Sequence, residues 1–237
     1  MVRAAPRQSG ALAELTEEIV ECRACPRLVE WREAVAREKR AAFRDEAYWG
    51  RPVPGFGDPR ARLLVTGLAP AAHGGNRTGR IFTGDRSGDW LFGALYRNGY
   101  ANQPTSLSAD DGLELRDAYV AAAVRCAPPA NKPTPAERDR CLSYLVRELE
   151  LLDRVRVIVV LGQFAYDATA RVLAAGGSSL PSPRPRFGHG VEVESDRAVV
   201  LCCYHPSQQN TFTGKLTESM LDAVFARARS LSTRSRR

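Results

Sequence analysis

A glycine-rich stretch, residues 67–85, combines the residue types from which ligand-binding loops are built. It directly follows the apolar run of residues 63–65 and contains five glycines and the carboxylate Asp85. Glycine adopts positive φ angles without strain and lets the backbone approach a ligand closely. The stretch therefore predicts a loop at an active site, with an ordinary glycine-rich connection as the alternative.

Three further segments carry polar groups directly after apolar runs. Residues 125–133 include Asn131, a Gly-Gln pair at 162–163 follows the next run, and His205 follows the last. Glycine, amide, histidine and carboxylate groups at four separate strand ends are more than structural turns require. We therefore expect these segments to form one active site.

Four of the six cysteines are spaced as a possible ligand set. Cys22 and Cys25 form a C-x2-C pair, and Cys126 and Cys141 are separated by fourteen residues. Four thiolates hold either zinc or a [4Fe–4S] cluster, and this spacing does not separate the two. The other two cysteines are adjacent within an apolar run, so their side chains should point to opposite faces of a strand as small core residues.

Hydrophobic periodicity predicts the elements that position these groups. Short runs rich in β-branched residues predict strands at 62–68, 119–124, 157–161 and 198–204. Spacings of three and four predict helices at 11–20, 27–40, 163–174 and 216–228, with another that begins at Ser87 or Gly88. A capping box at Thr134 and Glu137, with Pro135 between them, begins a further helix.

The alternation of these elements predicts an α/β fold: three αβα layers around a central, mainly parallel four-stranded sheet. Ligands of such sheets bind beyond the carboxyl ends of the strands, where the polar segments lie. We expect one domain over residues 1–237, with flexible tails at 1–10 and 231–237. Residues 48–60 should form a loop over the site, and residues 174–190 a flexible surface excursion.

Charge favours a polyanionic partner. The chain has 34 Lys and Arg against 27 Asp and Glu, a net charge of +7. It has neither a signal-peptide core nor an apolar run of about 20 residues, the length that spans a membrane. We expect a cytoplasmic, nucleoid-associated monomer with no membrane partner.

The motifs resemble those of the uracil-DNA glycosylase superfamily, and within it the iron–sulfur family 5, the bacterial type B enzymes. The resemblance rests on residues 67–80, on residues 125–133, on His205-Pro-Ser-Gln-Gln-Asn, and on the four-cysteine pattern, and it covers nearly the whole chain. It implies a monofunctional enzyme of base-excision repair with a structural [4Fe–4S] cluster bound by those cysteines. The expected partner is double-stranded DNA containing deaminated bases.

The chemistry of N-glycosidic cleavage assigns roles to individual residues. His205 can donate a hydrogen bond to the base oxygen where negative charge grows, although a histidine satisfied within a turn is the alternative. The resemblance implies that Asp85 and Asn131 position water or stabilise the sugar cation. Asp85 could also cap the helix that follows it. The resemblance places Phe82 against the extruded base, with core packing as its alternative.

Further residues are expected to contact the substrate. Those expected at the bound base are Gly67, Ala69, His73, Gly74, Phe82 and Ala122. Those expected to contact DNA are Arg77, Arg80, Lys132, Ser207, Gln208, Gln209 and Asn210, the last four as a wedge loop, with Arg186 and Lys215 as additional cationic candidates. Any one of these cations could instead be a solvated surface charge.

Two departures within the superfamily pattern predict a broad base spectrum. The uracil-restricted family 4 carries an asparagine four residues before the third cysteine and a glutamate after the first glycine of the loop, where this chain has Ala122 and Leu68. An apolar wall discriminates between bases weakly. The resemblance therefore implies removal of uracil, hypoxanthine and xanthine by base flipping, leaving an abasic site.

Two other functions stay open at this point. A non-catalytic iron–sulfur protein that binds nucleic acid would need the basic surface but not a convergent His205, Asp85 and Asn131. The covalent branch of the superfamily carries a Lys-Arg-Arg-Ile-His insert, whereas this chain passes from Arg80 to Phe82 without one.

Overall fold

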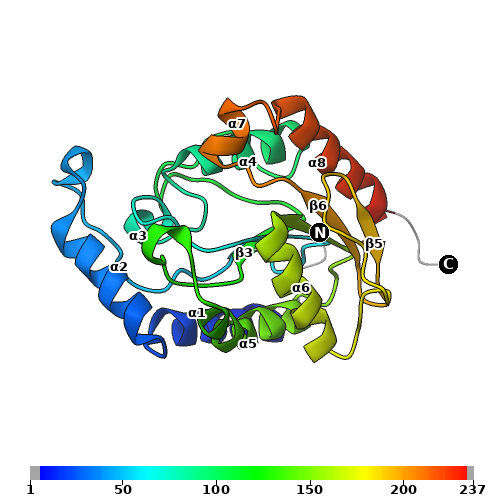
Figure 1. Ribbon diagram of the computed structural model, residues 1–237, viewed down its shortest axis with the longest axis horizontal. Helices are drawn as coiled ribbons and strands as arrows, with labels where there is room; N and C mark the ends of the chain where they lie inside the picture. The colour runs from blue at the N-terminus through cyan, green and yellow to red at the C-terminus, as the bar shows by residue number, and fades with distance from the viewer. Residues whose placement is uncertain (1–5, 234–237) are drawn as a thin grey trace.

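The computed structural model describes residues 6–233 as an α/β domain with helices on both faces of one sheet (Figure 1). The sheet has the strand order β1-β3-β2-β4-β6-β5. Its strands are β1 (Phe56–Gly57), β2 (Leu63–Gly67), β3 (Ala118–Ala122), β4 (Val157–Leu161), β5 (Glu192–Glu194) and β6 (Val199–Cys203). The α-helices are α1 (Pro6–Val20), α2 (Pro26–Glu38), α3 (Gly75–Thr78), α4 (Arg86–Arg97), α5 (Pro135–Leu151), α6 (Gln163–Ala175), α7 (Gln208–Phe212) and α8 (Glu218–Thr233). Two 3-10 turns complete the elements, η1 (Ala41–Phe43) and η2 (Pro129–Asn131).

The four predicted strands are confirmed as the parallel centre of the sheet, β3, β2, β4 and β6. Every residue of β2, β3 and β4 is buried, as expected for strands covered on both faces. The four-stranded count is wrong, because β1 and β5 add antiparallel edges. These edges are only two and three residues long, and β5 reads Glu-Val-Glu, so neither has the apolar run of a central strand.

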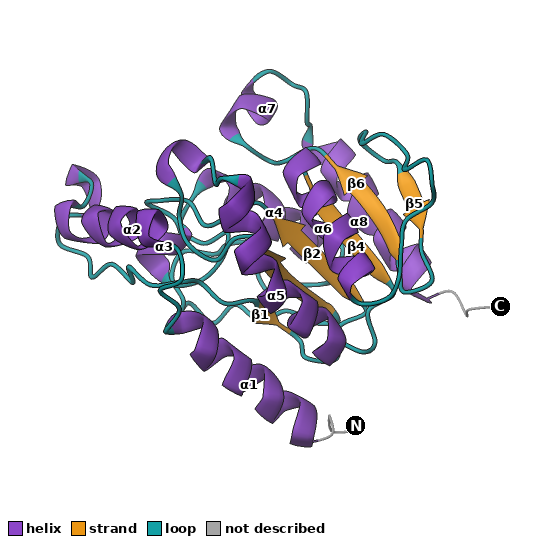
Figure 2. Cartoon of the chain, turned by 60° about the horizontal axis from the view of Figure 1, so that its bottom comes forward, coloured by secondary structure: helices purple, strands orange, loops and turns teal. Residues whose placement is uncertain are grey.

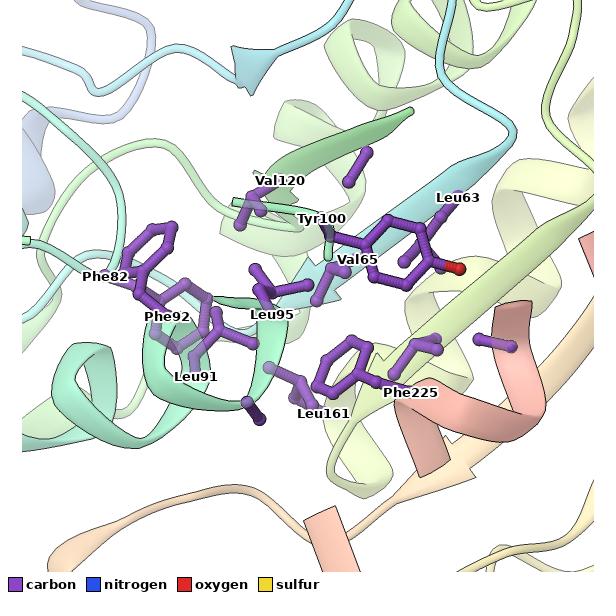
Figure 3. Close-up of a cluster of buried hydrophobic side chains, with 14 of the residues drawn as sticks. Leu63, Val65, Phe82, Leu91, Phe92, Leu95, Tyr100, Val120, Leu161 and Phe225 are labelled. Atoms are coloured by element: carbon purple, nitrogen blue, oxygen red, sulfur yellow. The ribbon is translucent and has the colours of Figure 1, made fainter. Parts of the chain in front are cut away.

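Each face of the sheet packs against its own helices (Figures 1 and 2). One core joins the sheet to α4 and α8, and Figure 3 shows its centre, with Leu91 and Leu95 beside Val65 and Phe225. The other core joins the opposite face to α1, α5 and α6. Cys203 belongs to the first core and Cys202 to the second, which confirms that these buried thiols point to opposite faces.

The predicted helices are confirmed, but α1 begins five residues earlier and α8 ends five residues later than predicted. The capping box is complete: the Thr134 hydroxyl accepts a bond from the Glu137 amide, and the Glu137 carboxylate accepts one from the Thr134 amide. The predicted tails are too long, because α1 already begins at Pro6 and α8 continues to Thr233 with Leu231 buried. Residues 1–5 and 234–237 of those tails lie outside the described residues.

The predicted loop over the site and the predicted surface excursion have different outcomes. Residues 48–60 pack against the glycine-rich loop through Trp49 and Gly50, whose amides donate to the carbonyls of Arg77 and Asn76, and they also contribute β1. The flexibility expected of residues 174–190 stays a prediction. Within the described chain, no helix has the length and apolar character needed to cross a bilayer.

Candidate active site

A cavity of about 490 Å³ lies beyond the carboxyl ends of the parallel strands, where such sheets bind ligands. We call it the strand-end cavity. It is lined by Leu68, Ala69, Ala71, Phe82, Asp85, Arg86, Ser87, Asn131, His205, Ser207, Gln208 and Gln209. The three predicted catalytic residues, which are far apart in sequence, thus meet in one cavity.

Asp85 both lines the cavity and caps α4. Its Oδ1 accepts a hydrogen bond from the Gly88 amide at 3.0 Å. Gly74 leaves room for the carboxylate, since a Cβ there would lie 2.2 Å from Asp85 Oδ2. Burial raises the pKa of Asp85, while hydrogen bonds from the Gly88 and Ser87 amides act in the opposite direction. The capping alternative and a place in the cavity therefore hold together for one side chain.

Asn131 is held at the cavity by an unusual backbone. Both Ala130 and Asn131 have left-handed conformations, with φ of 51° and 55°. Asparagine tolerates this region better than most residues, whereas alanine does so at a cost. The turn is closed by the Asn131 amide, which donates to the Pro128 carbonyl at 3.1 Å. Such local strain is often found where a side chain must be aimed.

His205 follows β6 and faces Phe82, with ring centroids 5.9 Å apart. Burial lowers the pKa of His205 to about 4, so the imidazole is neutral at pH 7. A neutral imidazole carries one N–H donor. The backbone here is fixed by Asn210, whose Nδ2 donates to the His205 carbonyl at 2.9 Å.

Phe82 lines the cavity and is also part of a core, so the two expectations for it are compatible. Its φ is 54°, a left-handed conformation that is rare for an aromatic residue. Two glycines make room for it: a Cβ on Gly67 would lie 2.6 Å from the ring, and one on Gly88 would lie 1.8 Å from its carbonyl oxygen. Gly67 therefore supports Phe82, and the cavity lining does not include it.

His73, Gly74 and Ala122, all predicted to bind the base, do not line the cavity. His73 Nδ1 shares a 3.0 Å hydrogen bond with the Tyr48 hydroxyl, and burial lowers its pKa. Ala122 is buried in the core, paired with Gly67 in the sheet. Base contact by these three residues stays a prediction that the cavity lining does not support. Ala69 does line the cavity, as predicted.

Arg77 and Arg80 are corrected from phosphate contacts to internal supports of the loop. Arg77 is 8% exposed, forms an ion pair with Glu46, and donates to the carbonyls of His73 and Gly84. Arg80 is 5% exposed and is paired with Asp111 at 2.7 Å. Their guanidinium donors are already used within the fold.

The other residues predicted to contact DNA lie at or near the surface. Ser207, Gln208 and Gln209 line the cavity. Lys132 is exposed, and Lys215 Nζ lies 4.9 Å from the centre of the Tyr204 ring. Arg186 is exposed and is not in the cavity lining.

Sequence reasoning missed Arg86, Ser87 and Ala71 in the cavity lining. Arg86 is exposed and follows Asp85 at the first position of α4. Its guanidinium lies 4.3 Å from the centre of the Phe212 ring. The sequence did contain a signal for this position, because Arg86 directly follows Asp85 and the two residues must lie at the same strand end.

A second, smaller cavity, of about 40 Å³, is lined by Cys22, Cys25, Cys126 and Cys141. We call it the cysteine cavity. The four thiols therefore come together as the spacing suggested. Among the described residues, however, no group of three or more His, Cys, Asp or Glu side chains is arranged to hold a metal ion.

Positively charged and N–H groups surround these thiols. Arg32 donates to Cys126 Sγ at 3.1 Å, Arg140 to Cys25 Sγ at 3.8 Å, and the Arg125 amide to Cys141 Sγ at 3.3 Å. Arg32 and Arg125 are fully buried, and three of their guanidinium nitrogens find no partner among the described residues. Buried cations with unused donors fit an anionic, sulfur-rich group at this place.

Comparison with known proteins places the chain in a family. The family model described as Uracil DNA glycosylase superfamily matches residues 54–229. This chain belongs to the uracil-DNA glycosylase superfamily. A Mycobacterium bovis protein named Type-5 uracil-DNA glycosylase is 56% identical over 226 residues, 94% of this chain and 83% of that protein. One of the same name from Thermus thermophilus is 49% identical over 91% of this chain and 96% of its own length.

A more distant relative helps to place the chain within the superfamily. An Archaeoglobus fulgidus protein named Type-4 uracil-DNA glycosylase is 31% identical over 65% of this chain and 70% of that protein. The type-5 relatives are thus both closer and matched over more of the chain. The superfamily match includes every residue of the strand-end cavity, while Cys22 and Cys25 precede it.

Proposed function

We propose that this chain is a uracil-DNA glycosylase, which hydrolyses the N-glycosidic bond of uracil in DNA and leaves an abasic site. The observation that carries the proposal is the meeting of Asp85, Asn131 and His205 in one cavity with Phe82. The names of the type-5 relatives support it.

Bond cleavage requires two kinds of stabilisation. As the C1′–N1 bond breaks, its electron pair leaves with uracil and the sugar becomes an oxocarbenium ion. Neutral His205 donates a hydrogen bond to the uracil oxygen where the negative charge collects, and one such donor is worth about 10²–10³ in rate. The Asp85 carboxylate offsets the positive charge on the sugar.

Water completes the reaction. Asp85 and Asn131 orient a water molecule, whose oxygen bonds to C1′ while its proton passes to the departing uracil anion. An ionised Asp85 is required for this step, so its raised pKa matters for the pH dependence. Asn131 is exposed on a strained turn. Its side-chain amide does not ionise, so its role in orienting water should not depend on pH.

The base must leave the helix to reach these groups. We propose that the nucleotide is extruded from double-stranded DNA and that its base stacks on Phe82. The strand-end cavity, at about 490 Å³, falls within the usual range of about 300–1,000 Å³ for small-molecule sites. Lys132 and Lys215 supply cations for the backbone of the DNA.

We propose a broad substrate range that includes hypoxanthine and xanthine. Leu68 lines the cavity where family 4 carries glutamate, so this part of the wall offers no hydrogen bond that would select a base edge. Ala122 contributes only indirectly, through the buried pairing that supports Gly67 and Phe82. Bases in mispairs, which unstack more easily, should be removed faster.

We further propose that the cysteine cavity holds a structural [4Fe–4S] cluster. When bound, the cluster would join the N-terminal segment to the segment that carries Asn131. Arg32 and Arg140 would donate to its ligand sulfurs, as they do to the thiols here. Purified protein should be brown and bleach as iron is lost. A colourless, fully active preparation with one zinc per chain would contradict the cluster.

The deciding experiment is multiple-turnover release of free base from oligonucleotides containing uracil or hypoxanthine. The proposal expects many uracils released per enzyme molecule, and hypoxanthine released at high enzyme concentration. A non-catalytic binding protein would release none, and a covalent trap would stop at one. Sizing of the same preparation should give a monomer, since one chain supplies the whole cavity. We expect an enzyme that acts on DNA to work in the cytoplasm, with the nucleoid.

A further inference from the structure

Helix α7 carries an exposed aromatic side chain beside a residue that lines the strand-end cavity. Its first residues, Gln208 and Gln209, line the cavity, and its last residue is Phe212. Figure 2 shows α7 projecting from the rest of the chain. Phe212 is 64% exposed, the most exposed large hydrophobic side chain of the described residues.

Phe212 is held in this exposed position by an arginine. The Arg86 guanidinium lies 4.3 Å from the centre of its ring, and Arg86 itself lines the cavity beside Asp85. A planar guanidinium on one face of a ring restricts it and leaves the other face available for stacking. This pair therefore links the catalytic carboxylate to an open aromatic face.

Single exposed apolar side chains are common and need no explanation by themselves. Leu107 is such a residue, 63% exposed and outside the cavity lining. Phe212 differs because it stacks on a cavity residue and ends the helix that begins at the cavity. Its position, more than its exposure, points to a role.

The polar residues expected to form the wedge are less suited to it. The Ser207 hydroxyl accepts a bond from the Asn210 amide, and Asn210 Nδ2 donates to the His205 carbonyl. Those two side chains hold the start of α7 and the catalytic histidine. The exposed glutamines are polar and flexible, whereas a flat apolar ring can replace a base in the stack.

We propose that Phe212 enters the base stack of double-stranded DNA where the target nucleotide leaves it, with Arg86 fixing the ring. This inference rests on the proposed function and adds the residue that keeps the duplex open. Extrusion costs the stacking of one base on its neighbours, and an aromatic side chain restores part of it. The role is needed in a duplex and much less in single-stranded DNA.

The test compares Phe212→Ala with the parent on uracil in three settings: a duplex, single-stranded DNA, and a duplex with a pyrene nucleotide opposite uracil. Loss of one base-stacking contact should slow single-turnover excision from the duplex by about tenfold or more. The loss on single-stranded DNA should be much smaller. Pyrene, which fills the stack and displaces uracil, should recover most of the rate on the duplex.

Leu107→Ala is the matched control, because it removes an equally exposed apolar side chain outside the cavity. Phe212→Trp, which keeps a flat ring, should retain most of the duplex activity. A Phe212→Ala rate that equals the parent's on the duplex, or an equal loss on duplex and single strand, would overturn the proposal.

A binding measurement separates this inference from the proposed function. Affinity for a duplex containing a stable tetrahydrofuran abasic analogue needs no catalysis. Phe212→Ala should bind this duplex about tenfold more weakly than the parent does, and Leu107→Ala nearly as tightly. If the parent releases no base, the proposed function fails, while this affinity still decides the role of Phe212: equal binding by parent and Phe212→Ala would remove it.

Discussion

The strand-end cavity and the cysteine cavity share one segment of chain but are built in opposite ways. The first is about 490 Å³ and is lined by polar and apolar side chains from three strand ends; the second is about 40 Å³ and is lined by four thiols among other residues. Residues 125–133 contribute Cys126 to one and Asn131 to the other. A strained turn at the strand-end cavity is thus anchored by a buried region a few residues away.

This difference indicates that the residues proposed for the reaction and the residues that stabilise the fold lie in separate regions. At the strand-end cavity, Phe82 and Asn131 occupy left-handed conformations that cost stability. At the cysteine cavity, Arg125 is fully buried with Glu148 as its ion-pair partner. Changes in the first region should therefore alter rate, and changes in the second should alter stability.

The largest effect is expected from His205→Ala. Removing the donor proposed to stabilise the departing uracil should lower single-turnover excision by about 10²–10³ and leave affinity for DNA largely intact. The control is His189→Ala, because His189 Nδ1 accepts a hydrogen bond from the Tyr204 amide and does not line the cavity. This variant should lower the excision rate far less. Parent-like excision by His205→Ala would remove the residue from the mechanism.

Asp85→Ala and Asn131→Ala should each lower the rate by a smaller factor, about 10²-fold. If both side chains hold the same water, the double variant should lose less than the product of the two single losses. A double-mutant cycle of single-turnover rates measures this coupling. Losses that multiply would show that the residues act separately.

The comparison predicts the reverse pattern for Cys126→Ala. If Cys126 binds the proposed cluster, its loss should remove visible absorbance and iron and lower the unfolding temperature by about 5–10 °C, since bound metal contributes folding energy. Cys202→Ala is the control, because the Cys202 thiol is also buried but lies in strand β6, outside the cysteine cavity. Unchanged absorbance and iron content in Cys126→Ala would exclude this cysteine as a ligand.

The pH dependence should come from Asp85 and not from His205. With its pKa near 4, His205 stays neutral through the region around 6.5 where an ordinary histidine titrates. Protonation of Asp85, whose pKa is raised above its usual value of 3.8 by burial, should produce the acid limb of kcat/KM. A limb with its midpoint near 6.5 that disappears in a His205 variant would contradict this assignment.

The smallest effect is a gain in stability from Asp85→Asn. A raised pKa means that folding favours the protonated acid, so this contribution is present at low pH and lost as pH rises through the folded-state pKa. At pH 7 the buried carboxylate therefore lowers stability. Asparagine still accepts the Gly88 bond as a helix cap. The variant should melt slightly higher and be far less active, whereas a lower melting temperature would contradict this.

The parts of the fold that were predictable are those with local signals. The central strands are short apolar runs, and the capping box at Thr134 and Glu137 is complete in both directions. Short edge strands carry no such signal, as β5 with its two glutamates shows. Its pairing with β6 depends on residues that are brought together only in the folded chain.

The candidate site was predictable at the level of strand ends and less so for individual side chains. Asp85, Asn131 and His205 follow apolar runs, so the parallel sheet brings them together. Arg80 looked like a surface cation because its partner, Asp111, is thirty-one positions away. The pairing of Arg86 with Phe212 likewise joins two distant segments.

The central claim is that the strand-end cavity receives the extruded base. The most direct measurement is a crystal structure with a duplex containing 2′-fluoro-2′-deoxyuridine, which resists cleavage. The account predicts that the uracil ring lies against Phe82, with a carbonyl oxygen at His205 and C1′ beside Asp85 and Asn131. A uracil that stays stacked in the duplex, or that occupies another surface of the protein, would contradict it.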